Sequence, residues 1–104
     1  MPVESKYCTA KDFTVWLMCE ARLHKAEAHG GQGVSFLYKL CRFLISANYG
    51  FRIYEYFPEN AESFLEPVKK FTLFYVDYLY RRIDRLSQNV SKNFRKLKKE
   101  ICKV

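Results

Sequence analysis

The residues best suited to binding chemistry are the basic side chains and tyrosines of the last third of the chain. Residues 68–104 hold 11 basic and 3 acidic side chains, whereas residues 1–67 hold 7 basic and 8 acidic ones. Lys and Arg bind phosphates and release the counterions of a nucleic acid, and a tyrosine ring can stack on a base. The expected phosphate contacts are Arg81, Arg82, Arg85, Lys92, Arg95, Lys96, Lys98 and Lys99, and the expected stacking residues are Tyr78 and Tyr80.

Other interpretations of the same residues stay open. Runs of Lys and Arg are also typical of a solvated helix face, and tyrosines are common in cores and in protein interfaces. The main alternative is therefore a protein-binding adaptor or inhibitor that docks a larger partner through its apolar and Tyr-rich surface. A third is a basic amphipathic helix that lies on an anionic membrane. The salt dependence of binding distinguishes the nucleic-acid hypothesis from the protein-binding one. Phosphate binding weakens steeply as ionic strength rises, and binding through an aromatic interface does not.

The remaining reactive residue types do not predict catalysis or a metal site. His24 and His29 are five positions apart, about 140° around a helix, so they do not converge on a metal as an i,i+4 pair would. The four cysteines lie 11, 22 and 61 positions apart, which is not zinc-site spacing, and we expect them to be reduced thiols. We therefore expect a non-enzymatic protein with no cofactor and no metal.

Gly30-Gly31-Gln32 resembles the tripeptide by which class I release factors and related ribosome-rescue hydrolases are known, in which the glutamine positions a water at peptidyl-tRNA. The resemblance covers three residues, Gly33 follows where those families have His, and no strand-rich segment comes next. We interpret these residues as a turn, because glycine readily adopts positive φ and ends helices.

This turn separates two predicted helices, over residues 10–28 and 34–48. In both, apolar residues recur at intervals of three and four, as on one face of a helix. Thr9 and Asp12 resemble a capping box at the start of the first helix, and Gly50 is placed to end the second. A tight turn between two such helices implies an antiparallel pair.

The segment from 51 to 67 has a less regular pattern. Residues 51–57 are rich in aromatic side chains, and we interpret them as an extended linker or a continuation of the second helix. Pro58 can open a short helix over 59–65, and Pro67 fits the first turn of the next helix, because proline has no N–H to lose there.

An apolar stripe runs through the C-terminal third. It comprises Val76, Leu79, Ile83, Leu86, Val90, Phe94, Leu97 and Ile101. The average spacing of about 3.6 residues predicts one basic amphipathic helix from 67 to 103, about 55 Å long. Such a helix is longer than a compact domain of this size, so it must pack against another chain, bend back or fray. The residues expected to form an oligomer or partner interface are Leu79, Ile83, Leu86, Val90, Leu97 and Ile101.

The sequence thus predicts a single all-α domain over residues 1–104. A helical hairpin and a short helix would pack on the long amphipathic helix of residues 68–104, as a bundle of four helices. No apolar run approaches the roughly 20 residues of a membrane span, and the N-terminus lacks the apolar region of a secretory signal, so we expect a cytoplasmic protein. The expected function is that of a small basic accessory or regulatory protein that binds RNA or DNA, as an oligomer.

Overall fold

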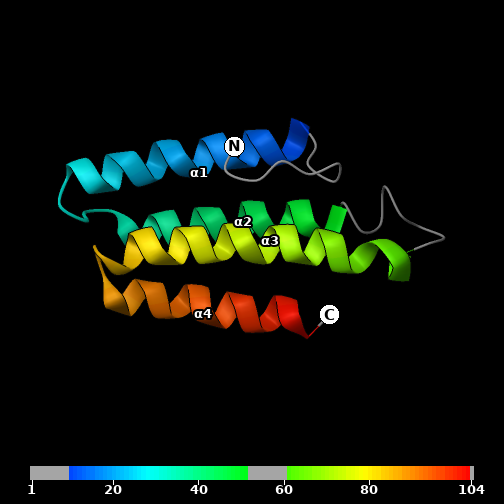
Figure 1. The fold of residues 1–104 in the computed structure, drawn as a ribbon. Helices are drawn as coiled ribbons and strands as arrows, with labels where there is room; N and C mark the ends of the chain where they lie inside the picture. The colour runs from blue at the N-terminus through cyan, green and yellow to red at the C-terminus, as the bar shows by residue number, and fades with distance from the viewer. Residues whose placement is uncertain (1–9, 52–60, 104) are drawn as a thin grey trace.

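The computed structural model describes residues 10–51 and 61–103, with side chains from residue 66 onward in the second range. These residues form four helices and no strand, so the chain is all-α as predicted. The helices form two packed hairpins, with α1 and α4 at opposite edges and α2 and α3 between them (Figure 1). The helices are α1 Ala10–Ala28, α2 Val34–Phe51, α3 Ala61–Asp84 and α4 Gln88–Cys102.

The turn between α1 and α2 is built by glycine, as predicted. Gly30, Gly31 and Gly33 have φ of +65°, +93° and +81°, values that glycine adopts without a steric cost. The Gly31 N–H donates to the Ala26 carbonyl at 2.8 Å, and the Gly30 N–H donates to the Glu27 carbonyl at 3.3 Å. These two bonds satisfy carbonyls of the last turn of α1 and end the helix.

The prediction of a single C-terminal helix over 67–103 is wrong, because the chain reverses direction between α3 and α4. The N–H groups of Leu86 and Ser87 both donate to the Ile83 carbonyl at 2.8 Å. The Ser87 hydroxyl then accepts a hydrogen bond from the Val90 N–H at 3.3 Å and caps α4. The segment therefore bends back on itself, which is one of the three outcomes expected for so long a helix.

The boundaries around Pro67 also differ from the prediction. α3 already begins at Ala61, so most of the separate short helix predicted over 59–65 belongs to its first turns. Pro67 lies inside α3 rather than at the start of a new helix, and its ring removes one backbone donor from that helix. The described residues form four helices, the predicted number, but the third and fourth divide the chain at a different place.

Several predictions fall on residues that the structure does not describe. Pro58 and the aromatic linker beyond Phe51 lie between 52 and 60, and Thr9 of the predicted capping box precedes α1. α1 itself begins at Ala10, where the sequence placed it.

The apolar stripe of the C-terminal third packs inside the bundle. Leu79 and Ile83 of α3 and Phe94 of α4 are completely buried, and Leu97 is nearly so. Burying side chains of this size is the main stabilising contribution to the fold. The other buried apolar residues are Cys19, Leu23, Ala26, Val34, Leu37, Cys41, Ile45, Tyr49, Val68, Tyr75, Val76, Val90 and Ile101.

Two buried thiols lie in the α1–α2 interface. Cys19 and Cys41 are both free and fully buried. The hydrogen bond that Cys41 shares with Cys19, together with burial, raises the pKa of Cys41 and keeps that thiol protonated. Cys102, at the end of α4, is free and exposed. Cys8 lies outside the described residues.

Candidate nucleic-acid interface

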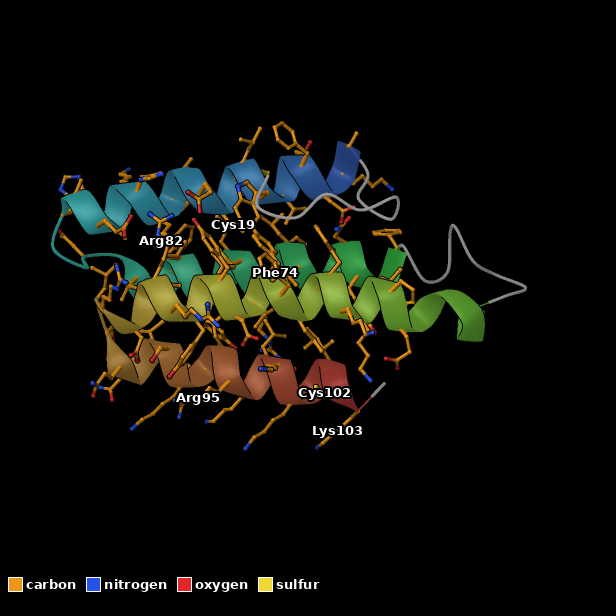
Figure 2. The ribbon with its side chains drawn as sticks, in the orientation of Figure 1. Cys19, Phe74, Arg82, Arg95, Cys102 and Lys103 are labelled. Atoms are coloured by element: carbon orange, nitrogen blue, oxygen red, sulfur yellow. The ribbon has the colours of Figure 1, made fainter. Side chains whose placement is uncertain are left out.

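The outer face of α4 carries a row of lysines. Lys92, Lys96, Lys99 and Lys103 follow one another at intervals of four, three and four residues, so they share one side of the helix. All four are exposed, whereas the opposite side of α4 is buried in the core. Figure 2 shows Lys103 at the end of α4, on the edge of the bundle away from α1. We call these four residues the lysine row.

Glu100 is the one acidic residue of α4. Its carboxylate lies 3.5 Å from the Arg42 guanidinium of α2, and both side chains are more than half exposed, so the pair adds little stability. α4 and Lys103 together hold six basic residues against this single acid. A surface of this composition attracts polyanions through its local positive potential.

Two cations of α2 lie beside the lysine row. Lys39 and Arg42 line a surface depression between α2 and α4 that Lys96 also lines. The Tyr38 ring meets Phe94 edge-on, with centroids 4.8 Å apart, and holds the two helices in this register. Sequence reasoning missed Lys39 and Arg42, because their place beside α4 depends on how the helices pack and not on local pattern.

Arg82 and Tyr78 lie on the side of α3 that faces α1, not beside the lysine row. Arg82 Nη1 is 3.0 Å from both carboxylate oxygens of Glu20, and Nη2 pairs with Glu27. The Tyr78 hydroxyl donates to Glu20, and its ring stacks on Trp16 with centroids 4.7 Å apart. The structure therefore places both residues in the α1–α3 contact and does not bring them to the lysine row.

The environment of Arg82 keeps it charged. Burial opposes the charge, but the hydrogen bonds with Glu27 and Tyr78 and the negative charge of Glu20 outweigh it and raise the pKa of Arg82. Burial and the hydrogen bond to Glu20 likewise raise the pKa of Tyr78, so its hydroxyl stays protonated. This cluster is an internal ion pair, not an anion site.

Lys98, Arg95 and Tyr80 join α4 to α3. Lys98 Nζ lies 3.0 and 3.1 Å from the two carboxylate oxygens of Asp77. The Arg95 guanidinium lies over the Tyr80 ring at 4.9 Å from the centroid and also donates to its hydroxyl. One face of the predicted stacking residue Tyr80 is thus covered by an arginine of the same chain.

The other predicted phosphate contacts divide between two places. Arg81 and Arg85 are both exposed, Arg81 in the last turn of α3 and Arg85 in the α3–α4 turn, so neither lies on α4. Lys92, Lys96 and Lys99 belong to the lysine row. Three of the eight predicted cations are therefore brought together in this row, and Arg95 and Lys98 flank it on the α3 side.

The expected self-association surface is instead the inside of the bundle. Its residues are buried or half-buried in this chain's own core, because the reversal between α3 and α4 folds the two halves of the stripe onto each other. Leu86, the one half-buried member, meets the α1–α2 turn at Gly31. These residues are Leu79, Ile83, Leu86, Val90, Leu97 and Ile101.

Within the described residues, none of the helices is both long and apolar enough to cross a membrane. Residues 10–51 and 61–103 also contain no group of three His, Cys, Asp or Glu side chains that could hold a metal ion. Comparison with protein-family models, with curated proteins and with solved structures found no match. The fold and this surface define the class of the protein as an all-α helical bundle with a cationic edge along α4.

Proposed function

We propose that this chain is a non-enzymatic accessory protein that binds nucleic acid, and that the lysine row contacts its phosphates. The observation that carries the proposal is the placement of four exposed lysines on one side of α4, with Glu100 as the single acid of that helix. Lys39 and Arg42 extend the cationic surface onto α2. Each phosphate that such a lysine neutralises releases counterions, which favours binding.

The proposed binding does not depend on base sequence. Tyr78 is stacked on Trp16 in the α1–α3 contact, and Arg95 covers one face of Tyr80, so neither ring is free on both faces. Phosphate contacts orient a nucleic acid but carry no sequence information. We therefore expect RNA and DNA oligonucleotides of unrelated sequence to bind with similar affinity.

An anionic membrane fits this surface less well. Interfacial helices insert an apolar face between lipid headgroups, but Phe94, Leu97 and Ile101 of α4 are buried in the bundle. The lysine row would then supply electrostatic adsorption without insertion. This difference favours nucleic acid as the ligand.

The test compares two variants that lose the same charge at different faces. The row variant neutralises three members of the lysine row and carries Lys92→Gln, Lys96→Gln and Lys99→Gln. The control variant neutralises three exposed cations outside α4 and carries Arg22→Gln, Lys25→Gln and Lys70→Gln. Fluorescence anisotropy of a labelled oligonucleotide measures the affinity, and circular dichroism measures the helix content.

We expect the row variant to bind at least about tenfold more weakly, a loss of about 1.4 kcal/mol, with unchanged helix content. The control variant should keep its affinity within about twofold of the unmodified chain. Equal losses in the two variants would assign the binding to total charge and contradict the proposal. An unmodified chain that does not bind at low salt would also contradict it.

A further inference from the structure

α2 exposes an apolar stripe on the side away from the core. Its residues recur at intervals of four, three, four and four, so they share one face of the helix. Phe36, Phe43 and Phe51 are 57%, 69% and 59% exposed, and the two smaller members are half-buried. Clustered exposed apolar side chains on a small protein mark an interaction site. We call this set the α2 stripe: Phe36, Leu40, Phe43, Ala47 and Phe51.

Cations border the α2 stripe on both sides. From α1, the Arg22 guanidinium lies 5.5 Å from the centroid of the Phe36 ring, and Lys11 Nζ lies 5.1 Å from that of Phe51. Toward α4, Lys39 and Arg42 line a shallow depression at the middle of the stripe. The described residues that line this depression include no Asp or Glu.

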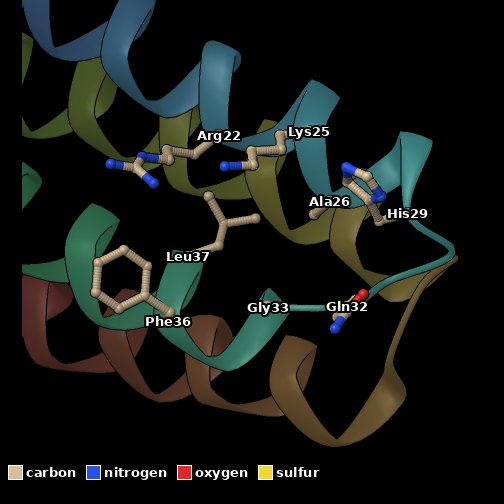
Figure 3. A pocket seen from close by; sticks show the side chains of 8 residues that line it. All are labelled: Arg22, Lys25, Ala26, His29, Gln32, Gly33, Phe36 and Leu37. Atoms are coloured by element: carbon tan, nitrogen blue, oxygen red, sulfur yellow. The ribbon is translucent and has the colours of Figure 1, made fainter.

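A hollow of about 340 Å³ lies at one end of the stripe, between α1 and α2 beside their turn (Figure 3). Ala26 and Leu37, both buried, supply apolar surface inside it, and Phe36 forms a wall. Arg22 and Lys25 reach over it from α1. The hollow is large enough for one bulky apolar side chain, and interfaces concentrate binding energy at anchors of this kind.

The residues of the glycine turn complete this hollow. His29, Gln32 and Gly33 line its end, and the remaining described lining residues include no acid. Gln32 offers amide donor and acceptor groups there, and His29 offers its ring nitrogens. The hollow is thus apolar inside and cationic or polar at its rim.

We propose that the α2 stripe and this hollow dock an acidic amphipathic helix of a partner protein. The apolar face of that helix would cover the stripe and place one bulky side chain in the hollow. Its acidic flanks would lie against Arg22 and Lys25 on one side and Lys39 and Arg42 on the other. Grooves that recognise helices use apolar anchors in this way, and charge complementarity selects the partner.

Charge complementarity separates this occupant from a second copy of the chain. Two copies that met through the stripe would bring Arg22, Lys25, Lys39 and Arg42 of one copy toward the same cations of the other. Opposed like charges at an interface are unfavourable, whereas an acidic helix neutralises them. The site shares Lys39 and Arg42 with the cationic surface beside the lysine row but contains no residue of the row itself, so the two proposals are tested by different variants.

The experiment uses synthetic peptides of about 18 residues, or five helical turns, and the full chain. The probe peptide has Trp and Leu at positions i, i+3, i+4 and i+7 and Glu on its flanks. One control peptide has Lys in place of each Glu, and another has the composition of the probe in scrambled order. The docking variant carries Arg22→Glu and Phe43→Ser, both at exposed positions, so its helix content should not change.

Isothermal titration should show that the probe peptide binds the unmodified chain and the row variant with equal affinity. The docking variant should bind it at least about tenfold more weakly. If the row variant no longer bound the probe peptide, the lysine row would be holding the peptide as a polyanion, and the proposal would be overturned. Failure of the probe to bind the unmodified chain, or equal binding of either control peptide, would also overturn it.

Two further measurements address other occupants of the stripe. Sedimentation with vesicles of anionic phospholipid, lost in the docking variant, would assign the stripe to a lipid surface. A dimer in light scattering that the docking variant loses would assign it to a second copy. Either result would overturn the acidic-helix proposal, and we expect neither.

Discussion

The α3–α4 hairpin carries positive charge on two sides, paired with acidic residues on the side that faces α1 and exposed to solvent on the outside of α4. Facing α1, Arg82 has Glu20, Glu27 and Tyr78 as hydrogen-bond partners, and its side chain is 22% exposed. On the outside of α4, the lysine row is exposed and that helix carries one acid. A partly buried charge needs partners, whereas an exposed charge keeps its water until a polyanion arrives. The first group holds the bundle together, and the second is available to a ligand.

The largest expected effect on stability comes from Arg82. Arg82→Ala should lower the free energy of unfolding by about 2 kcal/mol, because the Glu20 carboxylate, 16% exposed, loses its guanidinium partner and keeps the Tyr78 hydroxyl and the His24 ring. Urea denaturation measures this loss. Lys99→Ala, on the lysine row, is the matched control and should change the free energy by less than about 0.5 kcal/mol. Equal effects would remove the distinction between the two sides.

A second substitution sharpens the same point. In the Arg82→Ala background, Glu20→Gln should recover part of the lost stability, because a neutral amide costs less in this environment than a carboxylate that has lost its guanidinium partner. The comparison of the two urea midpoints measures the recovery. Further loss from Glu20→Gln would mean that the contacts of the Glu20 carboxylate with Tyr78 and His24 outweigh the cost of its charge.

The turn that separates the two sides depends on Ser87. Ser87→Ala removes the cap of α4 and should lower the free energy of unfolding by about 1 kcal/mol. Urea denaturation gives the value, and circular dichroism gives the helix content. A variant with more helix and no loss of stability would indicate one continuous helix and contradict the hairpin.

The smallest effect concerns thiol reactivity at the core and at the edge. Cys102 is exposed and should be alkylated rapidly, whereas Cys19 and Cys41 are fully buried and should react only when the bundle opens. Mass spectrometry of peptides after brief alkylation distinguishes them. Rapid modification of Cys41 would contradict the packing of α1 on α2.

Local signals predicted the turn of the first hairpin well, although α2 continues through Gly50 to Phe51, and they predicted the second hairpin poorly. Gly30, Gly31 and Gly33 end α1 through their own positive φ, so the break is visible in the sequence. Ser87 gives a weaker signal, because the apolar spacing from Ile83 through Leu86 to Val90 continues across the turn as if the helix did. A reversal at that point leaves both halves of the stripe in phase, and periodicity does not distinguish the two structures.

The cationic site was predictable in part for a similar reason. Lys92, Lys96 and Lys99 share a helix face, and their spacing shows this directly. The sequence assigned Tyr78 and Arg82 to the same predicted surface. Their partner Glu20 lies 58 and 62 positions earlier in the chain, so only the packing of α1 on α3 reveals the pairing.

The most direct test of the account is the salt dependence of nucleic-acid binding. Four phosphate contacts through the lysine row predict that log K falls against log salt with a slope of about −4, and the row variant, with three lysines removed, should give about −1. The control variant should keep the slope of the unmodified chain. A slope that is near zero, or that is the same in the row variant and the unmodified chain, would contradict phosphate binding by the outer face of α4.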